Sequence, residues 1–315
     1  MAELPTGRKQ LLIFCAAGAV LFLFPILIKR DDYINLMILI FLFTILAQSW
    51  NILAGYAGQV SLGHAAFFGI GAVATRVLWY TGLPYVMALF AGGIIAGCFS
   101  LAIGIPALRL RGIYFAIGTL GLAEIFRITI GNILPTVTPF PVEALVTYTL
   151  VTRYYLCLVL ALITVTIVFI ISNSKLGLGM VAVREDVDTA EASGVNTFRV
   201  KVMALIISSF LAGLAGGAYA YYQVSFYYDM PFSPIWTFDA MLIAFVGGVG
   251  TITGPIIGSL FYAIIREAFA LTMGQMHVLV FGVLFVLVVL LLPGGLVEVV
   301  AKGRRFFSGF KAKSI

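Results

Sequence analysis

The chain has 315 residues, of which 62% are hydrophobic and only 10% are charged, and its formal net charge is +6. A soluble globular domain has about 25% charged residues. A chain this apolar could not cover a surface in water, so the composition excludes an ordinary soluble fold and favours lipid as the solvent. The three cysteines, Cys15, Cys98 and Cys157, lie inside apolar runs and predict neither a disulfide framework nor a metal site.

A helix that crosses the hydrocarbon core needs roughly 20 mostly apolar residues. We expect the apolar segments of this chain to be helical, because unpaired backbone groups are costly in lipid. These segments are residues 11–28, 33–54, 60–80, 84–108, 112–131, 153–172, 200–222, 236–250, 254–271 and 276–292. The predicted fold class is all-α, a polytopic bundle of integral membrane helices with about 8–10 transmembrane segments, including two glycine-rich segments that are broken or re-entrant.

The positions of lysine and arginine predict the orientation of the chain, because cytoplasmic loops carry the excess. If the N-terminus is cytoplasmic and every segment crosses, 13 of the 19 cations lie inside and three lie outside. Both termini are then cytoplasmic, residues 132–152 lie outside, and residues 173–201 form a cytoplasmic loop. One re-entrant segment alone would instead put the termini on opposite sides. One permease domain occupies residues 1–315, and residues 302–315 form its basic cytoplasmic tail.

Residues 178–195 of the cytoplasmic loop have the pattern of one amphipathic helix that ends at Gly194. Apolar positions recur at spacings of three and four, with Arg184, Asp188 and Glu191 on the charged face. The apolar positions are Met180, Val183, Val187 and Ala190. Such a helix is either a solvated connector between spans or a rigid element that a cytoplasmic partner binds.

A first glycine-rich segment, residues 50–72, combines five glycines with the polar residues Asn51, Gln59, Ser61 and His64. So many glycines and polar groups lower helix stability. The segment is therefore either a broken or re-entrant helix, with free backbone groups beside protein or a wet cavity, or a helix packed closely on its neighbour. For His64 alone, we expect a hydrogen-bonded packing role rather than a proton relay.

A second glycine-rich segment, residues 245–259, has Gly250, Gly254 and Gly258 at intervals of four, which favours one glycine face on a packed helix. The alternative is a broken or re-entrant segment, since Pro255 weakens the helix further. Interrupted segments in both halves of a transporter often mark the substrate path. Together the two segments supply the candidate path residues. These are Asn51, Gly55, Gly58, Gln59, Ser61, His64, Gly247, Gly248, Gly250 and Gly254.

Charged residues inside membrane segments are functional candidates. Glu124 and Arg127 are three residues apart, so they share a helix face and can form an intramembrane ion pair. Arg76 lies near the outer end of its segment, where it can extend toward water. With His64, the pair could instead serve an ion-coupled secondary transporter or a channel, which is the alternative class of function.

Several motifs are absent from the sequence. It has no Gly-Lys dipeptide, and therefore no phosphate-binding loop of the Walker type. With two histidines and no His-Glu-x-x-His pattern, a metal site or a Ser-His-Asp triad is poorly supported. We therefore expect a transport subunit rather than an enzyme, with any ATP hydrolysis on another chain.

Three stretches together resemble the permeases of branched-chain amino acid ABC transporters, in particular their M-type subunit. They are residues 50–72, 182–220 and 247–259, and the similar order of segments covers about residues 33–300. The resemblance implies import of branched-chain or related hydrophobic amino acids across a bacterial inner membrane, with no cofactor on this chain and ATP used by partner subunits. Urea or short amides are alternative substrates within the same family.

The resemblance also implies partners, namely an H-type permease that completes a heterodimer, two ATPase subunits, an extracytoplasmic substrate-binding protein and membrane lipid, but no nucleic acid. It implies that residues 178–195 are a coupling helix that docks on an ATPase. The coupling residues are Arg184, Glu185, Asp186, Glu191 and Gly194. The family's Glu-Ala-Ala motif is here Glu191-Ala192-Ser193.

Overall fold

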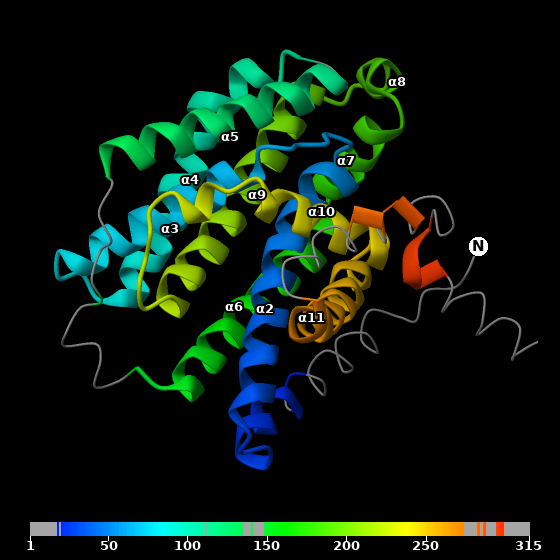
Figure 1. Cartoon of the computed structure of the whole chain (residues 1–315). Helices are drawn as coiled ribbons and strands as arrows, with labels where there is room; N and C mark the ends of the chain where they lie inside the picture. The colour runs from blue at the N-terminus through cyan, green and yellow to red at the C-terminus, as the bar shows by residue number, and fades with distance from the viewer. Residues whose placement is uncertain are drawn as a thin grey trace, which may run out of the picture.

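A computed structural model describes residues 18, 20–110, 112–134, 140, 148–273, 282–283, 286–287 and 294–298. The elements with defined bounds in these parts of the chain are all helices, which confirms the predicted fold class (Figure 1). They are α2 (Asp31–Asn51), the π-helix η1 (Ile52–Tyr56), α3 (His64–Tyr80), α4 (Tyr85–Ala107), α5 (Ile113–Ile133), α6 (Leu150–Ser172), α7 (Lys175–Glu185), α8 (Val187–Ala192), α9 (Thr197–Tyr222), the 3-10 helix η3 (Met230–Phe232), α10 (Ile235–Gly247) and α11 (Thr253–Met273).

Five of the described helices are long and apolar enough to cross a membrane: α2 with η1, α4, α5, α6 and α9. The predicted segment 11–28 is helical where it is described continuously, from residue 20 to residue 27. Most of segment 276–292, all of the predicted tail 302–315 and most of the outer connection 132–152 lie outside the described residues. The full count of 8–10 segments therefore stays a prediction.

Helix α2 is the centre of the bundle. It is apolar on all sides, a pattern typical of a helix surrounded by protein, and every residue from 40 to 57 is buried. In Figure 1, α2 runs between α3, α4 and α9 on one side and α10 and α11 on the other. It packs directly against α6, α9, α10 and α11. A displacement of α2 would therefore move helices on both sides of the bundle.

Two helices begin inside the bundle rather than at its ends. The backbone N–H of Ala65, at the start of α3, donates a hydrogen bond to Oγ1 of Thr237 in the first turn of α10 (2.8 Å). Nearby, the rings of Phe68 and Trp236 stack with centroids 4.6 Å apart. The first turns of α3 and α10 therefore meet within the protein.

The chain reaches both of these starting points through non-helical segments. Residues 57–63 precede α3, and residues 223–234 precede α10 with only the short η3 inside them. With 13 residues, α10 is about 20 Å long against a hydrocarbon core of about 30 Å. The apolar segments predicted from the sequence leave gaps at residues 55–59 and 223–235, so a connection before each helix was predicted. A break before α3 was also one of the two alternatives for the glycine-rich segment 50–72.

Helices α3 and α9 approach each other at glycines. A side chain at Gly71 would overlap the backbone of Gly213, and one at Gly216 would overlap the carbonyl group of Phe68. Small residues of this kind let helix backbones pack closely where lipid offers no hydrophobic driving force between helices. Close packing of α3 on α9 therefore depends on the absence of side chains at these positions.

We predict that Gly71→Ala lowers the free energy of unfolding by about 1–3 kcal/mol, because the added methyl group overpacks the α3–α9 contact. The matched control is Gly97→Ala in α4, where the new methyl group would meet its neighbours at ordinary distances of 3.7–3.9 Å. The measurement is thermal unfolding of the purified protein in detergent. Equal midpoints for the two variants would contradict the close approach.

Candidate coupling and translocation site

The predicted single coupling helix is two helices, α7 and α8. Asp186 separates them: its backbone is extended (φ −160°, ψ 122°), and its carboxylate accepts a hydrogen bond from the backbone N–H of Thr189 (2.6 Å). An aspartate in this geometry caps a new helix, which is why the helix does not continue through residue 186. Gly194 ends α8 with φ +84°, a conformation that favours glycine.

The cap also affects the charge state of Asp186. The hydrogen bond from Thr189 holds the pKa of the carboxyl below its ordinary value of 3.8. A lowered pKa means that the cap stabilises α8 above the ordinary pKa and is lost as the pH falls through the lowered value. Asp186 is therefore ionised, and α8 capped, at any pH near neutrality.

The amphipathic pattern of residues 178–195 is confirmed. Met180, Val183 and Ala190 are buried, while Asp188 and Glu191 are exposed. Glu191 accepts a hydrogen bond from the hydroxyl group of Thr197 at the start of α9. The apolar side of α7 and α8 thus rests on the bundle, and the acidic side faces away from it.

Arg184 connects α7 to the first glycine-rich segment. Its Nη1 donates a hydrogen bond to the carbonyl oxygen of Gly55 in the π-helix (2.8 Å). Its Nη2 pairs with Oε1 of Glu185 at 2.7 Å, an exposed ion pair that contributes at most about 1 kcal/mol. Gly58 (φ +69°) lies against the backbone and side chain of Arg184.

The second glycine-rich segment also contacts the guanidinium group of Arg184. Gly250 has φ +75°, and a side chain there would lie 2.7 Å from Nη1 of Arg184. Only glycine combines this backbone conformation with room for the guanidinium group. The predicted glycine face of residues 250, 254 and 258 is therefore wrong for Gly250, which lies in the break between α10 and α11, while Gly254 and Gly258 belong to α11.

Two amide side chains of α2, near the start of the first glycine-rich segment, form hydrogen bonds with the second, residues 245–259. Asn51 donates from Nδ2 to the carbonyl oxygen of Thr251 (2.9 Å) and accepts at Oδ1 from the backbone N–H of Gly250 (2.8 Å). Gln48 donates from Nε2 to the carbonyl oxygen of Ile252 (2.6 Å). These bonds give partners to backbone groups that the interrupted helix leaves unpaired. We call the set formed by Gln48, Asn51, Gly55, Arg184 and residues 250–252 the joint.

His64 lies deeper in the bundle and is fully buried. Its Nε2 is 3.0 Å from Oγ of Ser208, which donates a hydrogen bond to the carbonyl oxygen of Ser49. Nearby, Nε1 of Trp50 donates to the carbonyl oxygen of Ser61 (2.9 Å). His64 and Ser61 thus hold α2, α3 and α9 together, as expected for a packing histidine.

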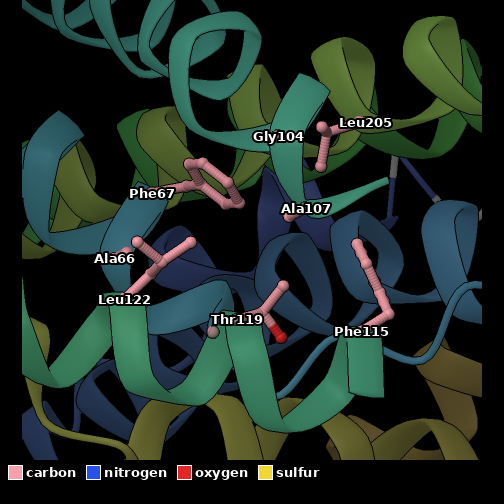
Figure 2. A pocket seen from close by; sticks show the side chains of 9 residues that line it. Ala66, Phe67, Gly104, Ala107, Phe115, Thr119, Leu122 and Leu205 are labelled. Atoms are coloured by element: carbon pink, nitrogen blue, oxygen red, sulfur yellow. The ribbon is translucent and has the colours of Figure 1, made fainter. Parts of the chain in front are cut away.

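The structure places the candidate path residues mainly at contacts between elements. Gly247 packs against Gly254 across the α10–α11 break, and Gly248 has φ +128° within that break. Among the path candidates, Gly58 and Gln59 border a cavity of about 250 Å³. A second cavity, about 20 Å³ and apolar, lies close by against Phe67, Phe115 and Thr119 (Figure 2).

A larger cavity, about 680 Å³, lies near the starts of α2 and α6, at the opposite end of α2 from Arg184. It is lined by Asp31, Asp32, Tyr33, Asn35, Leu36, Leu150, Arg153 and Glu267. Its lining therefore carries both signs of charge. Within the described residues, no group of three or more His, Cys, Asp or Glu side chains could hold a metal ion.

Arg76 corrects another expectation. It does not extend toward water but is fully buried. Its guanidinium group donates to the carbonyl oxygens of Ala220 (3.1 Å) and Val224 (2.9 Å) and lies over the rings of Trp79 and Phe140. Carbonyl groups at a helix C-terminus attract a cation. Arg76 therefore fixes the end of α9 to α3.

Glu124 and Arg127 form an ion pair on α5. Arg127 donates from Nε to both carboxylate oxygens (3.1 and 2.9 Å) and from Nη2 to Oε1 (2.5 Å). Their side chains are 37% and 41% exposed. Within this chain the pair thus lies on the surface of the bundle.

Sequence reasoning missed Gln48, Thr251 and Ile252 in the joint and Thr237 at the start of α10. Gln48 offered a signal, because an amide inside the apolar run 33–54 must find a hydrogen-bond partner. Thr251 and Ile252 contribute only carbonyl groups to the joint. Their part in the joint could not be predicted from residue type, since every residue has a carbonyl group.

The apolar helices, the interrupted segments and the polar joint between them define a multi-pass α-helical membrane protein. The chain belongs to the family of branched-chain amino acid transport system permease components, whose family model matches residues 33–289. No solved structure matches it.

Three relatives are named as branched-chain amino acid transport permease proteins LivM. The Salmonella typhimurium protein is 28% identical over 96% of this chain and 78% of its own length. The Escherichia coli protein is 27% identical over 91% of this chain and 75% of its own length. A protein of Methanocaldococcus jannaschii, named as a probable member, is 24% identical over 84% of this chain and 93% of its own length.

We predict that Asn51→Ala loosens the joint, because it removes the side chain that gives partners to the N–H of Gly250 and the carbonyl oxygen of Thr251. Leaving a buried polar group unpaired costs about 1–3 kcal/mol. Amide hydrogen exchange at residues 248–252 should rise about 5- to 150-fold. The control is Asn173→Ala, an exposed amide that bonds only within the end of α6, and equal exchange in both variants would contradict the role of Asn51.

Proposed function

We propose that this chain is a permease subunit of an ATP-driven importer that moves branched-chain amino acids across a bacterial inner membrane. Support comes from family membership over residues 33–289 and from relatives named as high-affinity branched-chain amino acid permeases. The five apolar helices suit a multi-pass location. The chain has no Gly-Lys dipeptide and so no Walker-type loop, which supports a transport role without its own ATP hydrolysis.

The transporter requires partners in this proposal. A second permease of H-type completes the membrane part, two ATPase subunits supply the energy, and an extracytoplasmic binding protein delivers the amino acid. The end of the bundle that carries α7 and α8 faces the cytoplasm, as the excess of lysine and arginine in the loops predicts. The acidic side of α8 is then available to an ATPase.

The joint supplies a mechanism for coupling. A displacement of α7 acts through Arg184 on the carbonyl group of Gly55, and therefore on the end of α2. Asn51 passes the same displacement to the break between α10 and α11. Since α2 with η1 has 26 residues, it extends about 39 Å toward the opposite end of the bundle. Motion of the coupling helices thereby reaches helices on both sides of α2.

The observation that carries this proposal is the hydrogen bond from Arg184 to Gly55. A side chain at the end of a surface helix reaches a backbone carbonyl of the interrupted span 129 residues away. A connector with only a solvated role would need no such contact. Asp186 then caps α8 and Gly194 ends it. Glu185 and Glu191 are exposed charges on the coupling helices.

We predict that Arg184→Glu uncouples the transporter. The new carboxylate would face the Gly55 carbonyl oxygen and lose a charge-assisted hydrogen bond of about 1.5–3 kcal/mol. Leucine uptake into proteoliposomes that contain the complete transporter should fall at least about tenfold, while the subunits stay together and ATP hydrolysis continues. Arg184→Lys keeps the charge without the planar fork and should lie between wild type and Arg184→Glu.

The matched control is Arg109→Glu, a charge reversal at an exposed arginine just after α4. It should leave uptake per ATP hydrolysed unchanged. Normal uptake by Arg184→Glu would contradict the coupling role. Uptake by the purified chain alone, without ATPase subunits, would contradict the importer and favour the ion-coupled or channel alternative.

A further inference from the structure

Helix α5 is the least covered of the five candidate spans. Only 22% of its most apolar stretch is buried, against 39–83% for the other four. One face of α5 presents large apolar side chains that stay exposed within the described part of the chain, Ile117 (60% exposed), Ile125 (60%) and Ile128 (54%). Gly121 lies on this face too, and no described atom beyond the neighbouring backbone of α5 lies within 4 Å of the position where its side chain would start.

An apolar face alone could simply meet lipid, but the same face carries the Glu124–Arg127 ion pair. Glu124 lies 11 residues from the start of α5, or about 16 Å along a helix that is about 32 Å long. Both side chains remain more than a third exposed. Charged side chains at this depth almost always face protein or a water-filled cavity.

The geometry of the pair rules out the usual escape to the membrane surface. The nearer end of α5 for Arg127 is Ile133, six residues further along the chain. The guanidinium group instead reaches back to Glu124, toward the middle of the helix. Since neither side chain extends toward water, a lipid neighbour would leave both charges in hydrocarbon.

A third charge lies beside the pair. Cβ of Asp229, in the non-helical run before α10, is 3.6 Å from the position of a side chain on Gly131 of α5. Asp229 is exposed and close enough to attract Arg127 electrostatically. Two carboxylates and one guanidinium group thus share one uncovered patch of the bundle.

We propose that this face of α5 is the surface on which the second permease subunit packs, so that Glu124, Arg127 and Asp229 are enclosed in the seam between the two chains. Gly121 allows a partner helix to approach closely, as small residues do at contacts between membrane helices. The inference rests on the proposed function, from which it takes the existence of a second permease.

Photo-crosslinking in cells that express the complete transporter tests the assignment. A photoreactive amino acid is placed at Ile125, and the matched control is at Ile94 of α4, which is 57% exposed. The two positions lie at similar distances from the outer ends of their helices, and α4 has no charged side chain. We expect an adduct with the second permease from Ile125 and none from Ile94.

An adduct from Ile94 instead of Ile125, an adduct with a second copy of this chain, or only lipid adducts from Ile125 would overturn the proposal. Leucine uptake by the unmodified complete transporter is measured in the same cells. Absent uptake there would contradict the proposed function, whereas normal uptake with lipid adducts alone contradicts only the assignment of the face.

A pair of variants gives a second test, in case the photoreactive residue prevents assembly. Arg127→Leu leaves the Glu124 carboxylate unpaired in the seam and should reduce co-purification of the second permease more than about tenfold. The double variant Glu124→Leu, Arg127→Leu removes both charges and should restore most of it, because apolar replacement of an enclosed pair is tolerated. Unchanged co-purification of both variants would overturn the proposal.

Discussion

The hydrogen bonds between Asn51 and the backbone of Gly250 and Thr251 are the contact on which the arrangement of this protein depends. They join segments about 200 residues apart in the chain, at the places where α2 and the α10–α11 pair lose regular α-helical geometry. An interrupted helix exposes backbone groups, and lipid offers them no partner. Side chains and backbone groups of the two interrupted segments therefore bond to each other. Gln48 and Arg184 give partners to the carbonyl groups of Ile252 and Gly55.

The same constraint explains two further sets of buried polar contacts. Ser208 forms hydrogen bonds with His64 and with the carbonyl oxygen of Ser49 near the end of α2. Arg76 donates a hydrogen bond to the carbonyl oxygen of Ala220 near the end of α9. In each case a polar group inside the bundle links two or more helices rather than facing a cavity. The mixed-charge patch on α5 differs from these contacts, since its charges pair with one another on the surface of the bundle.

Much of the fold could be predicted from the sequence, because continuous apolar runs such as 33–54 and 153–172 allow only a helix in lipid. Clustered glycines left a break at residues 57–63 and at residues 248–252 as an alternative to a closely packed helix, and the burial of Met180 and Val183 followed from helical spacing. These features depend on local composition and periodicity, which a single sequence displays.

The remaining features depend on contacts between distant residues. Nothing near Gly55 indicates that its carbonyl group meets Arg184, and nothing near Arg76 indicates that the end of α9 surrounds it. The break at Asp186 was missed because the apolar spacing continues through it, whereas the cap depends on one carboxylate–amide bond.

The central claim is that α7 and the joint move as one body. Spin labels at Lys175 in α7 and Val60 beside the π-helix, both exposed, report their separation in the assembled transporter. A second pair, Lys175 with Tyr80 at the end of α3, reports motion relative to the opposite end of the bundle. The account predicts that ATP binding changes only the Lys175–Tyr80 distance. A change in the Lys175–Val60 distance, with Lys175–Tyr80 constant, would contradict it.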